Sequence, residues 1–176
     1  KGGYHITRML EQQGMTFATA EVLKKQFGYA APQFVEKNVR LRVPATPEIG
    51  GEMVISSSEL AEAIEMKVKE ILEPLLNELQ KIEQRITTLY ITGGGSMLQG
   101  IADYLQQKTQ LRVQFGAHNL LLKNDTEEKY LSPQYAALVG TILLGQDYRD
   151  NHKNQLVRKP SFFERVKENT LDMFID

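Results

Sequence analysis

The hydrophobic positions change their spacing several times along the chain, and each spacing predicts a different element. Steps of three and four predict two short leading helices, over residues 6–10 and 19–27, and a long helix over 58–82. Ser56 and Glu59 match a capping box, which predicts where the long helix begins. Pro74 lies inside this helix, so we expect a kink or a break near residues 70–73.

Strands are predicted where apolar residues alternate with charged ones or form short runs. Alternation covers residues 35–43 and 112–115, and a short apolar run covers 89–91. The glycines at 93–95 follow that run, and the spacing beyond them predicts a helix over 97–107. A further helix is expected from Ser132 to Leu144, ending at Gly145, because serine and proline are typical of helix starts and glycine of helix ends. Together these elements predict an α/β protein.

Composition and charge narrow the functions that this α/β chain can have. Lys and Arg number 21 against 22 Asp and Glu, so no net positive field attracts nucleic acid, and we expect no nucleic-acid partner. Cysteine is absent, which excludes disulfides, thiolate zinc sites and cysteine nucleophiles. The three histidines lack metal-ligand spacing, so no metal site is expected. The chain opens Lys-Gly-Gly without methionine, and we expect it to be part of a longer protein.

The glycine run at 93–95 is the most informative feature for chemistry. Three glycines permit positive φ and leave the main chain bare, so a bulky group can lie against it. A helix beginning near Ser96 would point its free N–H groups at the same spot, which favours a phosphate or a polar ligand edge. A tight structural turn is the alternative. A Walker loop is excluded, because no Gly-Lys-Ser/Thr follows.

Four segments in order resemble the bacterial cell-division family FtsA of the actin-like superfamily: residues 2–7, 20–28, 91–103 and 132–140. The segment over 91–103 resembles the adenosine motif of that superfamily. The resemblance implies the second half of an actin-like (ribonuclease H-like) ATPase fold. A larger subdomain would comprise residues 1–13 and 86–145, a small subdomain 14–85, a flexible linker 146–160 and an amphipathic helix 161–176.

The resemblance also implies a nucleotide site for ATP with Mg²⁺ in the full-length protein. Glu21 and Lys24 would hold the ribose and adenine, and the glycine turn would supply Gly93, Gly94, Gly95, Ser96 and Met97. The alternative is a solvated Glu and Lys on an amphipathic helix. The groups that grip the terminal phosphates and Mg²⁺ are expected outside this chain, so we predict no hydrolysis by the chain alone.

The implied partners are the C-terminal tail of FtsZ, other copies in a filament, and the inner face of the cytoplasmic membrane at the division site. Lys67, Arg40 and Arg42 are the candidate contacts for the acidic tail. The terminal helix gathers an apolar face that would enter the membrane, made of Phe162, Phe163, Val166, Met173 and Phe174. The alternative is that this helix packs on protein. The implied function is to polymerise and tether the FtsZ ring to the membrane.

Two other classes stay open at this point. A metabolic kinase or ATPase with the actin fold would share the glycine turn but gives no reason for a polar linker and an amphipathic end. An actin-like binding module of pilus assembly would share the fold and serve another membrane system.

Overall fold

The computed structural model describes residues 2–44, 46–47, 50–82, 85–116 and 127–156. The chain divides into two compact units, Lys1–Ala136 and Ala137–Asp176, and each is described by itself. The first unit holds the elements that form the candidate site.

Three helices of the first unit confirm the periodic segments of the sequence. They are α1 (Gly3–Glu11), α2 (Phe17–Phe27) and α3 (Ser57–Lys81). The capping box is present: the Ser56 hydroxyl accepts from the Glu59 amide at 3.2 Å, and the Glu59 carboxylate accepts from the Ser56 amide at 2.7 Å. Of the kink or break expected near residues 70–73, the break is wrong, because α3 is continuous through Pro74. The turns before Pro74 are held by the core, with Ile64 and Val68 buried and Leu72 packed against it, and this tertiary packing outweighs the one backbone bond that proline removes.

A hairpin precedes α3 and was only half predicted. Strand β1 (Arg40–Pro44) pairs antiparallel with β2 (Glu52–Ser56), a strand that the sequence reasoning missed. The predicted strand began at residue 35, but the ladder begins at Arg40 because its partner is Ser56, the residue at which the chain turns into α3.

A parallel pair of strands carries the glycine turn. Strand β3 (Thr88–Ile91) leads into a 3₁₀ turn, η2 (Gly94–Met97), then into helix α4 (Ile101–Thr109) and the parallel strand β4 (Arg112–Phe115). The prediction that the helix follows the glycines directly is wrong. Gly100 adopts φ +73° at the start of α4, and a Cβ there would lie 2.8 Å from the Phe34 side chain. A left-handed glycine therefore separates the turn from the helix.

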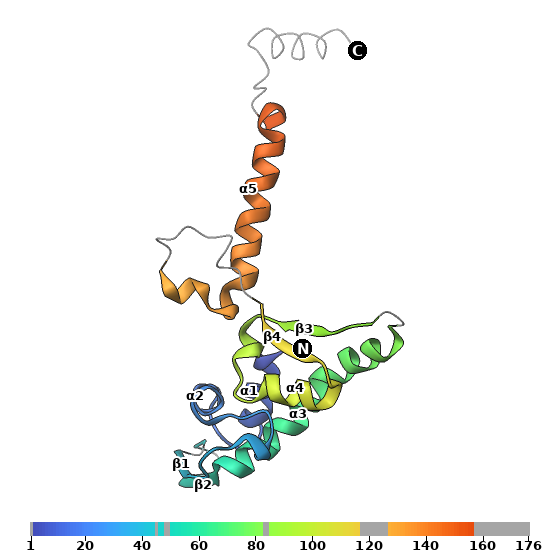
Figure 1. Cartoon of the computed structure of the whole chain (residues 1–176). Helices are drawn as coiled ribbons and strands as arrows, with labels where there is room; N and C mark the ends of the chain where they lie inside the picture. Colours follow the sequence, from blue (N-terminus) through green and yellow to red (C-terminus); the bar gives the residue numbers. More distant parts are fainter. Residues whose placement is uncertain (1, 45, 48–49, 83–84, 117–126, 157–176) are drawn as a thin grey trace, which may run out of the picture. The chain divides into compact units, whose positions relative to one another are not determined.

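One hydrophobic core joins these elements. Its fully buried members include Leu10 of α1, Leu60 and Ile64 of α3, and Tyr104 and Leu105 of α4. Side chains of β3 and β4 pack against the same cluster. Figure 1 shows the β1–β2 hairpin beside the first turns of the long α3, and α4 beside its later part. The core thus fixes α1, α2 and the glycine turn around a common space.

The described residues of the first unit also form three further short 3₁₀ helices: η1 (Pro32–Phe34), η4 (Glu128–Leu131) and η5 (Pro133–Tyr135). Ser132 and Pro133 therefore begin a 3₁₀ turn, and helix α5 (Ala136–Leu156) follows it. This helix passes Gly145, so the predicted end there is wrong and residues 146–156 of the predicted linker are helical. One interior glycine costs only about 1 kcal/mol, and no proline interrupts the polar residues that follow. The terminal helix predicted over 161–176 lies outside the described residues.

None of the helices formed by the described residues is long and apolar enough to cross a membrane.

Candidate functional site

A cleft of about 610 Å³ opens where α1, α2 and the glycine turn meet. Its volume falls in the range of about 300–1,000 Å³ that is typical of small-molecule sites. Glu21 and Lys24 line it from α2, and Gly94, Gly95 and Met97 line it from the turn. The structure therefore brings together two groups of predicted residues that lie some seventy positions apart in the sequence.

Glu21 and Lys24 are tied to each other and to α1 by short polar contacts. The Lys24 ammonium donates to the Glu21 carboxylate at 2.6 Å, to the Thr7 hydroxyl at 2.8 Å and to the Gly3 carbonyl at 3.2 Å. The Thr7 hydroxyl lies 2.5 Å from the same carboxylate oxygen of Glu21. The Lys24 side chain is only 13% exposed, and Glu21 is 28% exposed. These two residues are therefore fixed side chains at the wall of the cleft and not a mobile pair on a helix surface.

The charge of the Glu21 carboxylate is set by these neighbours. Partial burial alone would raise its pKa, but hydrogen bonds from Lys24, Thr7 and Lys25 outweigh burial and lower the pKa to about 2. Glu21 is therefore ionised throughout the physiological pH range. Each carboxylate oxygen can accept more than one hydrogen bond, so Glu21 suits a ligand that presents hydroxyl groups.

The glycine turn presents bare main chain to the cleft. Gly93 adopts φ +81°, its amide donates to the Pro133 carbonyl at 2.9 Å, and its carbonyl accepts from the Ser96 hydroxyl at 2.8 Å. An added Cβ at Gly94 would meet nothing within 4 Å, and one at Gly95 would only approach the Gly3 amide at 4.0 Å. The amides of Gly94 and Gly95 make no hydrogen bond to any described residue. This stretch of backbone therefore leaves room for a ligand and has donors to offer it.

Two predicted residues of the turn do not line the cleft. Gly93 precedes the turn and is absent from the lining of the cleft, and Ser96 is buried with its hydroxyl bonded to the Gly93 carbonyl. The helix N-terminus expected at Ser96 is also absent, because α4 begins at Ile101. The donors at this spot are therefore the amides of a short turn and not the first turn of a helix.

Sequence reasoning missed three polar side chains that line the cleft. Lys25 follows Lys24 on α2 and pairs with the second oxygen of Glu21 at 3.1 Å. Tyr4 of α1 and Gln134 of η5 complete the wall. All three lie inside the segments that carry the family resemblance, and this position was the signal that could have found them.

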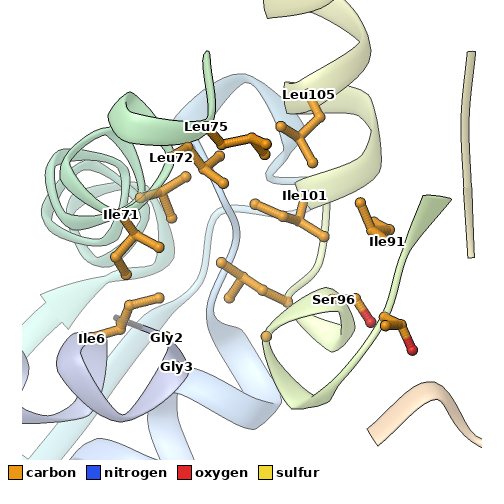
Figure 2. A pocket seen from close by; sticks show the side chains of 14 residues that line it. Gly2, Gly3, Ile6, Ile71, Leu72, Leu75, Ile91, Ser96, Ile101 and Leu105 are labelled. Atoms are coloured by element: carbon orange, nitrogen blue, oxygen red, sulfur yellow. The ribbon is translucent and has the colours of Figure 1, made fainter. Parts of the chain in front are cut away.

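A second cavity of about 280 Å³ shares Gly95 and Leu98 with the cleft and is lined mainly by apolar side chains. Figure 2 shows its wall, with Ile71, Leu72 and Leu75 of α3 facing Ile101 and Leu105 of α4 and Ile91 of β3. None of the described residues that line it carries a charge. A polar or charged ligand is therefore suited to the first cleft and not to this cavity.

The predicted contacts for an acidic peptide lie away from the cleft and already face carboxylates. Arg40 and Arg42 stand on the exposed face of β1, with Arg42 at 3.9 Å from Glu52. Lys67 forms an ion pair with Glu70 one turn further along α3. An incoming carboxylate would have to compete with these pairs. The membrane contacts predicted at Phe162, Phe163, Val166, Met173 and Phe174 lie outside the described residues.

The class of the protein follows from this architecture and from its structural relatives. The chain is similar to MreB5 of Spiroplasma citri bound to ADP, with a TM-score of 0.62 and 18% identity over 86% of this chain and 46% of that one. It is also similar to MreB5 of Spiroplasma citri bound to AMPPNP, with a TM-score of 0.58 and 18% identity over 87% of this chain and 46% of that one. The chain thus has an actin-like α/β fold, as predicted.

The family follows from the sequence comparisons. The family model "Cell division protein FtsA" matches residues 2–140. The chain is 27% identical over 146 residues to cell division protein FtsA of Neisseria meningitidis serogroup B, which covers 80% of this chain and 34% of that protein. The chain belongs to the FtsA family of cell-division proteins. It spans about a third of the length of this curated relative.

Proposed function

We propose that the chain binds an adenine nucleotide in the cleft between α1, α2 and the glycine turn, as the second half of an actin-like cell-division ATPase. The observation that carries the proposal is that the ionised Glu21 and the bare backbone of Gly94 and Gly95 face one cleft. The similar MreB5 structures are bound to ADP and to AMPPNP, which supports this class of ligand.

The residues present fit the parts of a nucleoside. Glu21 would accept hydrogen bonds from the ribose hydroxyls, and the exposed Met97 and neighbouring Leu98 would cover an apolar purine face. The amides of Gly94 and Gly95 would donate to the first phosphate. Among the described residues no cluster of three His, Asp or Glu side chains is placed to hold a metal, so no residue of this chain is assigned to Mg²⁺.

Titration calorimetry with ADP tests the proposal. The wild-type chain should bind ADP, and Glu21→Gln should weaken binding about tenfold or more, because a hydrogen bond to a charged group contributes about 1.5–3 kcal/mol. Glu62→Gln, on the exposed side of α3, is the matched control and should bind as wild type does. Absence of ADP binding by the wild-type chain, or equal affinity of both Gln variants, would reject the nucleotide site.

The proposal extends to a partner of the small subdomain, residues 14–85. The family implies the FtsZ tail, and the exposed Arg40 and Arg42 with Lys67 are cations that an acidic peptide could contact. A tail peptide should bind the chain less tightly after the double change Arg40→Ala and Arg42→Ala, and after Lys67→Ala. Lys81→Ala, an exposed ion-paired lysine at the end of α3, is the control. Unchanged peptide binding in all variants would remove these residues from the interface.

The last part of the proposal concerns attachment of filaments to the inner face of the membrane at the division site. Residues 161–176 would bind weakly as one copy, because basic and acidic residues balance over 158–176, and self-assembly would raise the effective concentration. Co-sedimentation with anionic vesicles should require residues 160–176 and should rise with protein concentration. Equal sedimentation without these residues would refute the assignment.

A further inference from the structure

Thr7 is a polar residue with no solvent exposure at the place where α1 meets α2. The described part of the chain buries two serines as well, but each bonds a backbone carbonyl: Ser57 bonds Val39, and Ser96 bonds Gly93. The Thr7 hydroxyl instead touches two charged side chains, Glu21 and Lys24. Its burial is therefore coupled to the charges that line the cleft.

The hydrogen atoms available in this network decide which bonds form. The Lys24 ammonium has three N–H groups, and three protein acceptors lie within 2.6–3.2 Å of it, so each N–H has a partner inside the fold. The Thr7 hydroxyl has one hydrogen, and Glu21 at 2.5 Å is a nearer acceptor than the Gly3 carbonyl at 3.2 Å. Thr7 therefore donates to Glu21 while its oxygen accepts from Lys24.

The two oxygens of Glu21 end up in different environments. Oε2 accepts from both Thr7 and Lys24, which are fixed by the packing of α1 against α2. Oε1 is paired with Lys25, a lysine whose side chain is 70% exposed. Oε2 is thus held in place, while Oε1, whose partner Lys25 also lines the cleft, can accept a further hydrogen bond.

We propose that Thr7 is a positioning residue that, by holding Oε2 of Glu21 together with Lys24, presents Oε1 to the hydroxyl groups of the ligand. This inference rests on the proposed nucleotide function and deepens it. Lys24 shares the positioning role, because its ammonium has no N–H left for a ligand. Glu21 is then the side chain of this group that bonds the ligand directly.

Two substitutions separate the hydroxyl of Thr7 from its methyl group. Thr7→Val keeps the shape and removes the hydroxyl, and Thr7→Ser keeps the hydroxyl and removes the methyl. Thr141→Val is the control, because the Thr141 hydroxyl donates to a backbone carbonyl of its own helix, that of Ala137, and not to a charged side chain. The variants are compared by ADP calorimetry and by a carbon NMR titration of the Glu21 carboxyl, assigned with Glu21→Gln.

Thr7→Val should weaken ADP binding about threefold to tenfold, and the Glu21 carboxyl should titrate at higher pH than in the wild-type chain, because one stabilising donor is lost. Thr7→Ser should restore both, and Thr141→Val should change neither. The inference is overturned if Thr7→Val leaves the titration and the affinity unchanged, or if Thr7→Ser behaves like Thr7→Val. If the wild-type chain binds no ADP, the nucleotide function fails, while the titration still decides whether Thr7 holds Glu21.

Discussion

Replacing Glu21 by Gln should change how the stability of the fold depends on pH. The pKa of Glu21 is lowered from 4.5 to about 2 by contacts that exist only in the folded chain. Since a pKa difference of one corresponds to about 1.4 kcal/mol, the ionised carboxylate stabilises the fold by about 3 kcal/mol at neutral pH. Water screens the contact with the exposed Lys25, so we expect about 2 kcal/mol.

The sign of the effect follows from proton binding. Between the two pKa values the unfolded chain binds more protons than the folded chain, so the contribution of Glu21 is complete above about pH 4.5 and is lost as the pH falls toward 2. Gln cannot ionise. Glu21→Gln should therefore be less stable than wild type by about 2 kcal/mol at pH 7, and the gap should shrink to less than about 1 kcal/mol at pH 3.

Urea unfolding at pH 7 and pH 3, followed by circular dichroism, measures this gap. The slope of free energy against urea should be equal for both proteins, so that the midpoints report stability alone. Glu62→Gln should follow the wild-type chain at both pH values, because the Glu62 side chain is exposed on α3. A gap between Glu21→Gln and wild type that is the same at both pH values would refute the reasoning.

Three further predictions concern the scaffold and are checked by thermal or urea unfolding. Gly28→Ala should destabilise the chain by about 1–3 kcal/mol, because the added Cβ would lie 2.4 Å from the Lys24 carbonyl. Gly94→Ala is the control and should be close to neutral, because a Cβ there meets nothing within 4 Å. Ser56→Ala should cost about 1 kcal/mol by removing the cap of α3, and an unchanged midpoint would show that the cap does not stabilise the helix. Leu60→Ala should cost about 2–5 kcal/mol, because Leu60 is fully buried in the core; a loss below 1 kcal/mol would contradict that packing.

Local signals in the sequence were sufficient where one interaction decides the structure. The capping box at Ser56 and Glu59 marked the start of α3, because both partners lie within one turn. The alternation around Val113 marked β4, since strands place successive side chains on opposite faces. Gly145, in contrast, did not end α5, because the cost of one glycine is small against a helix that continues on both sides.

The sequence by itself determined the actin-like fold, the family and the identity of Glu21, Lys24 and the glycine turn as candidates, because these depend on the order of residues along the chain. Only the tertiary structure decided which of them meet. The packing of α1 against α2 placed Thr7 on Glu21, and the left-handed Gly100 moved the start of α4 away from the turn. Lys24 and Lys25 contact Glu21 from the same helix, at spacings that the sequence shows. The hydrogen bond from Thr7 joins residues on separate helices, and no spacing in the sequence encodes that distance.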